Sequence, residues 1–246
     1  MAILMHHGVK NQQWGVRRGP PYPIKPGAPI HIKKGTHVKR ISPRDESTAT
    51  GHAYANVYKE DSDRFTGFFA KENGGARKIH KKTQYQLDLE VQVDLNGPTA
   101  KQRIETFKQL ISDDKRFGKE LTKYDDSQFS KSDLRKFRKQ KLDEVTLLRD
   151  GYQTFVAAIG GNEYLRNSYF NALRSQGFNM VTDDLDSGLF ARSAFIVFDR
   201  ETNLKQVGIK ELKPKEINDA FKKYTRYIDR SEQFRTWEEY LEGKYK

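Results

Sequence analysis

The segment from residue 84 to residue 95 constrains the fold of this chain more than any other. Its apolar side chains stand at every second position, at Tyr85, Leu87, Leu89, Val91, Val93 and Leu95. Because alternate side chains of a β-strand point to opposite faces, this pattern predicts a strand with one face against a core. Asn96-Gly97-Pro98 ends the pattern, and Thr99 is suited to cap a helix. We therefore expect a mixed α+β domain in which helices follow this strand.

Shorter apolar runs predict the other strands of the sheet. They cover residues 30–32, 38–41, 53–58, 178–181, 194–198 and 204–212. Turn and loop residues separate them, as in Lys34-Gly35, in the polar loop 42–50 and in the acidic loop 183–193. The brief apolar run 66–70 fits either a helix or a strand. The sheet is interrupted by the long segment 99–176, which has helical periodicity.

Segment 99–176 carries helix signals in its caps and in its apolar spacing. We expect helices over residues 99–124, 131–148, 155–159 and 162–176. Ser130-x-x-Asp133 has the form of a capping box, and Asn162 is a favourable N-cap residue. Gly177 is a natural C-cap, because glycine adopts the left-handed conformation without strain. One or two further helices are expected within residues 217–241.

The chain divides by composition into three parts. Residues 1–29 indicate a binding segment and a linker whose prolines favour an extended, semi-rigid spacer: Pro20, Pro21, Pro23, Pro26 and Pro29. Residues 30–212 are expected to form the α+β domain, and residues 213–246 a helical C-terminal extension. The chain has neither a run of ~18 apolar residues nor the apolar region of a secretory signal. We therefore expect a soluble protein that is made in a cytoplasm.

The composition excludes cysteine-based chemistry and shows a strong positive charge. The chain has 246 residues, no cysteine and a net charge of +12. The lack of cysteine excludes disulfides, cysteine-ligated zinc and a cysteine nucleophile. The positive charge is either a solubilising surface excess or a means of contacting a polyanion, such as packaged DNA or an acidic protein shell. The basic residues are spread along the chain without a known nucleic-acid-binding motif, so the sequence leaves both interpretations open.

The N-terminal segment 6–18 is polar, yet it is rich in residues that bind. It combines His6-His7, Trp14 and Arg17-Arg18 within thirteen residues. It has too little apolar surface to offset the entropy of ordering, so we expect it to bind another molecule rather than fold alone. Adjacent histidines with no third ligand nearby do not make a metal site, and we expect no metal there.

This segment resembles a tag, roughly His-His-Gly-Ile-Lys-Gly-Gln-Lys-Trp-Gly-Val-Arg-Arg, found near the start of many proteins encoded in the head gene clusters of tailed phages of Gram-positive bacteria. Asn11 and Gln13 replace a Gly and a Lys of that pattern. The resemblance implies a minor structural protein of the virion, associated with the head or portal in several copies and assembled in the host cytoplasm, with no membrane contact. It also implies that capsid, portal or other virion proteins bind residues 6–18, through His7, Trp14, Gly15, Arg17 and Arg18.

The order of elements over residues 30–212 resembles the ADP-ribosyltransferase-like fold, an α+β fold with a mixed, mostly antiparallel split sheet. The most specific part is a helix ending in Gln176-Gly177-Phe178-Asn179, then the acidic loop, then Phe195-Ile196-Val197-Phe198-Asp199. In active members an Arg or His on the first strand helps to bind NAD, and Arg40 matches that position. The resemblance implies a catalytic carboxylate as well, for which the candidates are Asp183, Asp184, Asp186, Glu211 and Glu216.

Departures from that pattern favour a domain without transferase activity and without a cofactor. Tyr54-Ala55-Asn56 stands where active members have Ser-Thr-Ser, and no Glu-x-Glu precedes a later strand. Arg40 would then simply pair with a surface acid. The run Asp183–Gly188 shares features with calcium loops but lacks their spacing and closing Glu, which favours a plain turn.

Three functions follow from these features. The first is a virion structural protein held by its N-terminal tag. The second is an ADP-ribosyltransferase effector, packaged with or encoded beside the capsid, which would use NAD. The third is a basic nucleic-acid-binding protein of the phage head.

Overall fold

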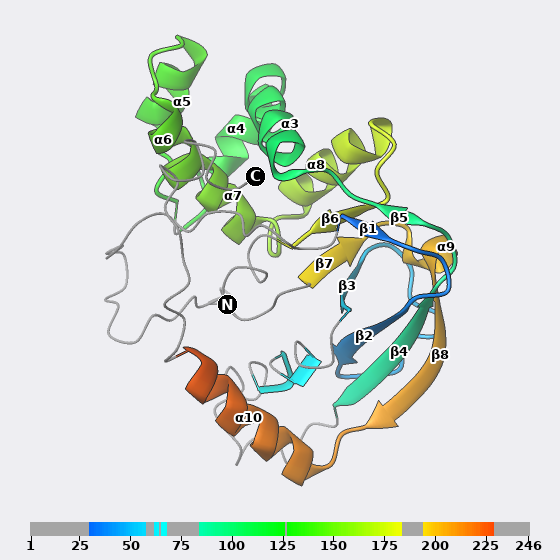
Figure 1. Ribbon diagram of the computed structural model, residues 1–246. Coiled ribbons are helices and arrows are strands. Elements are labelled where there is room, and N and C mark those ends of the chain that lie inside the picture. Colours follow the sequence, from blue (N-terminus) through cyan, green and yellow to red (C-terminus); the bar gives the residue numbers. More distant parts are fainter. Residues whose placement is uncertain are drawn as a thin grey trace. The chain divides into compact units, whose positions relative to one another are not determined.

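The computed structural model describes residues 30–57, 62–63, 65–67, 84–125, 127–183 and 194–228, with side chains as far as residue 223. These residues belong to two compact units (Figure 1). The sheet unit comprises the described residues of 30–97 and 178–228, and the helical unit comprises those of 98–177. The protein is thus α+β, with its strands in the first unit and most of its helices in the second.

The sheet unit is built on a six-stranded sheet in the order β6-β7-β3-β2-β4-β8. Every pairing in it is antiparallel. The strands are β2 (His37–Ser42), β3 (Ala53–Asn56), β4 (Tyr85–Val91), β6 (Met180–Thr182), β7 (Ala194–Val197) and β8 (Leu204–Glu211). The described parts of the strands expected from the apolar runs are therefore confirmed, with boundaries that shift by at most two residues.

A second, two-stranded sheet corrects the longest predicted strand. Strand β4 stops at Val91, and β5 (Leu95–Asn96) pairs instead with β1 (His31–Ile32). Between them the Gln92 amide donates to the Asn203 carbonyl over 2.9 Å, and the Asp94 carboxylate accepts the Lys34 amide at 2.8 Å. These bonds draw the chain out of the large sheet, although the alternation of apolar residues continues to Leu95.

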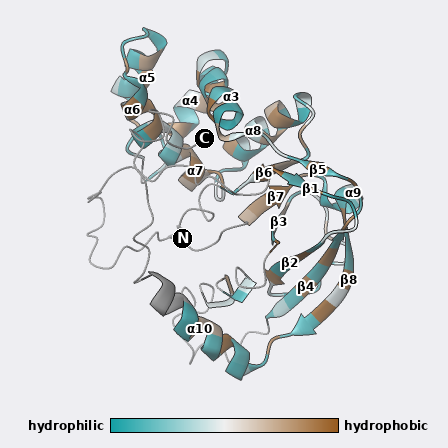
Figure 2. Ribbon diagram, viewed as in Figure 1, coloured by the Kyte–Doolittle hydropathy of each residue, from teal (hydrophilic) through white to brown (hydrophobic). Residues whose placement is uncertain are grey.

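One face of the large sheet carries an apolar core. Because directly opposed residues in an antiparallel pair share a face, the pairing of Val38 with Leu89 and of Ala55 with Phe195 defines that face. The core cluster is completed by Ile32, Ala53, Leu87, Val91, Leu95, Met180, Val197 and Leu204. Figure 2 shows β7 as strongly apolar. Residues Ala194–Val197 are all buried, which is why β7 reads as a continuous apolar run.

The described part of the sheet unit also contains helical residues, at 62–63, at 65–67 and in two helices after β7. The short helix α9 (Arg200–Asn203) connects β7 to β8, and it follows Asp199, whose φ is 47°. Helix α10 (Pro214–Ile228) is amphipathic and buries Ile217 and Ala220. The helical tail expected within residues 217–241 is confirmed as far as residue 228; residues 229–246 lie outside the described part of the chain.

The helical unit contains more breaks than its periodicity predicts. Its elements are α3 (Ala100–Asp113), α4 (Lys115–Leu121), α5 (Lys131–Arg138), α6 (Glu144–Thr146), the π-helix η1 (Leu147–Tyr152), α7 (Gln153–Ala158) and α8 (Glu163–Ser175). The helix expected over 99–124 is broken at Asp114, whose carboxylate accepts the amides of Arg116 and Phe117 and so starts a new helix. The predicted caps Thr99, Ser130 and Asn162 are confirmed.

The helix expected over 131–148 ends early because its C-terminus closes in a Schellman motif. Gln140 has a φ of 55°, its amide donates to the Phe137 carbonyl, and the Lys141 amide donates to the Lys136 carbonyl. Beyond this point Asp143 caps a new turn that leads into the π-helix. At Gly151 in that π-helix, a Cβ atom would lie 3.3 Å from the Phe129 ring, so the ring packs on the bare backbone.

Aromatic rings form the centre of the helical unit. Phe107 lies 5.2 Å from Tyr152 and 6.3 Å from Phe117 between ring centroids, and Phe155 lies 4.8 Å from Tyr169. All five rings are almost fully buried. Edge-to-face packing of this kind adds to the stabilisation from burial, so this unit has a core of its own.

Candidate functional site

Arg40 occupies the centre of the large sheet, on β2. It is directly opposite Leu87 of β4, which places it on the apolar face. Its guanidinium donates from Nε to Glu46 Oε2 over 2.7 Å, from Nη2 to Glu46 Oε1 over 3.1 Å and from Nη1 to the Tyr54 carbonyl over 3.0 Å. The expectation that Arg40 pairs with a surface acid was wrong in one respect: its partner Glu46 is buried, with only 7% of its side chain exposed.

A second arginine, distant in the sequence, binds the same carboxylate. Arg200 of α9 forms an ion pair with Glu46 Oε2, and its Nη2 donates to the Glu46 carbonyl over 2.9 Å. Ser42 Oγ donates to Glu46 Oε1 over 2.7 Å. We call Arg40, Ser42, Glu46 and Arg200 the Glu46 cluster. It holds two positive charges and one negative charge at the edge of an apolar core.

The loop that carries Glu46 is fastened along its length to α9 and β8. The Arg200 amide donates to the Gly51 carbonyl over 2.6 Å, and the Gly51 amide donates to the Glu201 carboxylate over 2.9 Å. Gly51 has a φ of 85°, a conformation that favours glycine. Gln206 Nε2 donates to Asp45 Oδ1 over 2.8 Å. The loop is therefore held in one conformation, and the donors of Arg40 point into it.

The cluster controls the ionisation of Glu46. Burial acts to raise the pKa of this carboxyl group, but hydrogen bonds and charge from Arg40, with bonds from Ser42 and Arg200, outweigh it and lower the pKa from 4.5 to about 2. The carboxylate is consequently charged at neutral pH. A carboxylate neutralised in this way is a structural acceptor, and it does not have the raised pKa of a general acid.

The candidate acids in the described part of the chain do not gather around Arg40. Asp183 follows β6 and is 6% exposed, whereas Glu211 ends β8 and is exposed. Strands β6 and β8 are the two edges of the sheet, so these carboxylates lie at opposite sides of it. Glu216 pairs with Lys210 and accepts the Lys213 amide over 2.9 Å at the start of α10.

Several predicted site residues lie outside the described part of the chain. They are Asp184 and Asp186 of the acidic loop and the tag residues His7, Trp14, Gly15, Arg17 and Arg18. Within the described residues no group of three or more His, Asp or Glu side chains is arranged to hold a metal ion. In that same part of the chain, no helix is long and apolar enough to cross a membrane.

A polar cluster on the opposite face of the sheet was not predicted from the sequence. Asp88 of β4 accepts from His37 Nδ1 at 3.0 Å and from Lys39 Nζ at 2.7 Å. Burial acts to raise the pKa of Asp88, but hydrogen bonds from Lys39 and His37 outweigh it and lower the pKa. In the sequence, these three residues are marked only as polar positions that alternate with apolar ones along a strand. Such alternation does not specify which strands are neighbours, so it could not predict this cluster.

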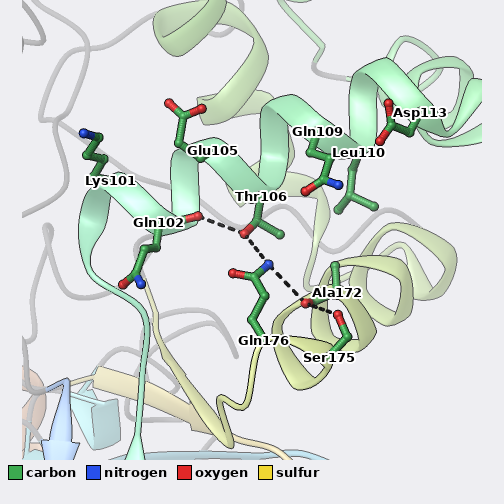
Figure 3. A pocket seen from close by; sticks show the side chains of 10 residues that line it. All are labelled: Lys101, Gln102, Glu105, Thr106, Gln109, Leu110, Asp113, Ala172, Ser175 and Gln176. Carbon is green, nitrogen blue, oxygen red and sulfur yellow. Dashed lines mark hydrogen bonds between the residues drawn. The ribbon is translucent and has the colours of Figure 1, made fainter.

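A groove lined mainly by polar residues lies between α3 and α8 of the helical unit and has a volume of about 460 Å³ (Figure 3). Gln176 lines this groove, and its Nε2 donates to Thr106 Oγ1 over 3.0 Å and to the Ala172 carbonyl over 3.1 Å. Lys101, Glu105 and Asp113 also line it. The groove holds no nucleophile with an adjacent base, so it supports no catalytic assignment.

Comparison with known proteins assigns no family. No protein-family model and no curated protein matches the chain. A chain in the crystal structure of the M. tuberculosis MbcT-MbcA toxin-antitoxin complex is similar in structure, with a TM-score of 0.40 and 10% sequence identity over 78% of this chain and 92% of that chain. A likeness this distant does not bear on the function of the chain.

Proposed function

We propose that this chain is a minor structural protein of a tailed-phage particle, held at the head or portal by its N-terminal segment. The observation that carries the proposal is the run His6–Arg18, with its paired histidines, central Trp14 and paired arginines. We further propose that the α+β domain shares the ADP-ribosyltransferase-like fold but serves as a structural module without transferase activity.

The chemistry of the segment suits binding to a folded partner. Trp14 would be the apolar anchor, since tryptophan contributes most when it fills a pocket at the centre of an interface. Arg17 and Arg18 would pair with carboxylates of the shell, and arginine forms two parallel bonds to a carboxylate. Gly15 would let the partner approach the backbone closely.

The Glu46 cluster supports a role without catalysis. A nicotinamide cofactor would have to bind a guanidinium whose Nε, Nη1 and Nη2 each already donate one hydrogen bond within the sheet unit. Freeing them would leave Glu46, a buried carboxylate, with one fewer partner, which is costly. The arginine therefore acts as part of the framework that holds the loop between β2 and β3.

The test is mass spectrometry of purified particles from the source phage, with peptide coverage of residues 1–30. We expect the wild-type protein at defined stoichiometry and the Trp14→Ala/Arg17→Ala variant at a strongly reduced level. The matched control is Trp237→Ala/Arg235→Ala, which removes the same residue types near the other end of the chain. Wild-type levels of the tag variant, or absence of the protein from particles, would contradict the proposal.

A second candidate is an NAD-dependent ADP-ribosyltransferase, favoured by the position of Arg40 in the middle of an antiparallel sheet. Purified protein would be incubated with NAD, and free nicotinamide would be measured. Turnover that is lost in Arg40→Lys and kept in Arg44→Lys would establish this second function. Under the structural proposal, wild-type protein releases no nicotinamide above the buffer control.

A further inference from the structure

The helical unit presents a dense positive surface on α5 and the turn that follows it. Residues 131–141 contain six basic side chains and one carboxylate; the basic ones are Lys131, Arg135, Lys136, Arg138, Lys139 and Lys141, and all six are exposed. The carboxylate of Asp133 belongs to the capping box with Ser130. A net charge this high on so short a segment attracts polyanions.

Three of these side chains form a line along the helix. Lys131, Arg135 and Lys139 follow one another at intervals of four residues, so they lie on one face. We call them the α5 ridge. Four residues of helix rise roughly 6 Å, which is close to two phosphate intervals of about 3.4 Å each along the axis of one DNA strand. The ridge thus matches the repeat of a phosphate backbone.

The ridge is held in place before any partner binds. Leu134 of α5 is buried, and its Cδ1 would lie 2.9 Å from a Cβ atom at Gly118, so it packs on the bare backbone of α4. The capping box at Ser130 and the Schellman motif at Gln140 close both ends of the helix. A preformed cationic surface binds more tightly, because less entropy is lost on binding.

The composition of the exposed face distinguishes among partners. Besides the basic residues, it presents only Ser132 and Gln140, while Leu134 is buried and Phe137 is half-buried. Figure 2 shows α5 as mostly hydrophilic. Protein interfaces need an apolar or aromatic centre, and membrane-binding helices need an apolar face. Contacts to phosphates need only cations and polar donors.

We infer that the α5 ridge is a binding surface for the phosphate backbone of duplex DNA, without sequence preference. The inference uses only residues of the helical unit and does not rest on the proposed virion function. Lys131, Arg135 and Lys139 each contact a phosphate, and Lys136, Arg138 and Lys141 add to the local field. Binding releases the cations condensed on the DNA, so it weakens steeply with salt.

The test compares two triple variants that lower the net charge equally. Lys131→Gln/Arg135→Gln/Lys139→Gln removes the ridge, and Lys34→Gln/Lys205→Gln/Lys215→Gln removes three exposed lysines of the sheet unit. Fluorescence anisotropy with a labelled 30-base-pair duplex of arbitrary sequence is measured from 50 to 200 mM NaCl. Circular dichroism verifies that both variants are folded.

The ridge variant should bind on the order of tenfold or more weakly at 50 mM salt, and its log–log salt slope should be shallower by about 2 to 3. The control variant should keep most of the affinity at 50 mM salt and most of the salt slope. Lys131→Arg/Arg135→Lys/Lys139→Arg, which keeps the charges, should restore the slope. Equal losses in the two Gln triples, wild-type binding that ignores salt, or capture of phosphatidylserine vesicles but not duplex DNA would overturn the inference.

Discussion

The guanidinium of Arg40 and the carboxylate of Glu46 form a two-pronged ion pair, with Nε–Oε2 and Nη2–Oε1 distances of 2.7 and 3.1 Å. Arg200 binds the same carboxylate from a position 154 residues further along the chain. The pair therefore joins β2, the loop after it and α9 into one network. With the bond from Nη1 to the Tyr54 carbonyl, three of the five N–H donors of Arg40 are used within the sheet unit.

Replacing Glu46 with Gln should destabilise the sheet unit by roughly 3–5 kcal/mol, because two guanidinium groups would lose their shared buried counter-charge. Urea denaturation followed by circular dichroism measures this loss. Glu211→Gln is the matched control, since Glu211 is an exposed carboxylate at the end of β8 in the same unit, and it should change the unfolding midpoint little. Equal effects of the two substitutions would show that the cluster does not support the fold.

The same carboxylate predicts a pH dependence. Its pKa is lowered to about 2 in the folded protein, so its contribution is complete above the unfolded value of 4.5 and is lost as the pH falls toward 2. The difference in unfolding free energy between wild type and Glu46→Gln should shrink by about 3 kcal/mol over that window. A difference that stays constant from pH 6 to pH 2.5 would refute the lowered pKa.

Asp114 should stabilise the helical unit in two separable ways. Its Oδ1 accepts the amides of Arg116 and Phe117, and its Oδ2 accepts the Tyr164 hydroxyl over 2.6 Å. Asp114→Ala should cost about 1 kcal/mol or more, because it removes the N-cap of α4 as well as the second bond. Asp114→Asn keeps an oxygen for the cap and should cost less.

Tyr164→Phe removes the bond between the helices and keeps the cap, so it should cost less than Asp114→Ala. Asp113→Ala, at the neighbouring exposed carboxylate, serves as the control and should have little effect in thermal denaturation. If Asp114→Ala and Asp114→Asn proved equally destabilising, the capping role would be wrong.

Gly118 of α4 is expected to be the position on which α5 packs most closely. A Cβ at this position would meet Leu134 Cδ1 at 2.9 Å and Cδ2 at 3.2 Å, so Gly118→Val should displace α5 and destabilise the helical unit by roughly 1–3 kcal/mol. Gly161→Val is the control, because nothing lies within 4 Å of a Cβ there. Thermal denaturation of both variants measures the difference, and equal melting temperatures would argue against close packing of α5 on α4.

Local signals in the sequence predicted most of the elements. The alternation at 85–91 indicated β4, and Thr99, Ser130 and Asn162 correctly marked helix starts. Gly177 was correctly placed in the left-handed conformation, with a φ of 88°. Helix ends inside 99–176 were missed at Asp114 and Gln140, because apolar periodicity continues across both and the cap geometry that breaks the helix is a property of the backbone.

The partners of the candidate residues could not be predicted in the same way. Arg40 was named as a candidate because of its position on the first long strand, yet nothing near it in the sequence indicates Arg200 as a neighbour. Glu46 was one of the acids in a polar loop, and the sequence did not mark it as the partner of Arg40. His37, Lys39 and Asp88 looked like ordinary solvent-facing residues of two strands until the pairing of β2 with β4 brought them together.

The sequence by itself determined which segments are strands and helices, the absence of cysteine chemistry and the strong positive charge, because these depend on residue type and on neighbours a few positions away. Only the tertiary structure decided the strand order β6-β7-β3-β2-β4-β8, the register that opposes Arg40 to Leu87, and the sharing of Glu46 by Arg40 and Arg200. The physical reason is that strand pairing and buried ion pairs depend on contacts between residues far apart in the chain, and many pairings satisfy the same local pattern of alternation.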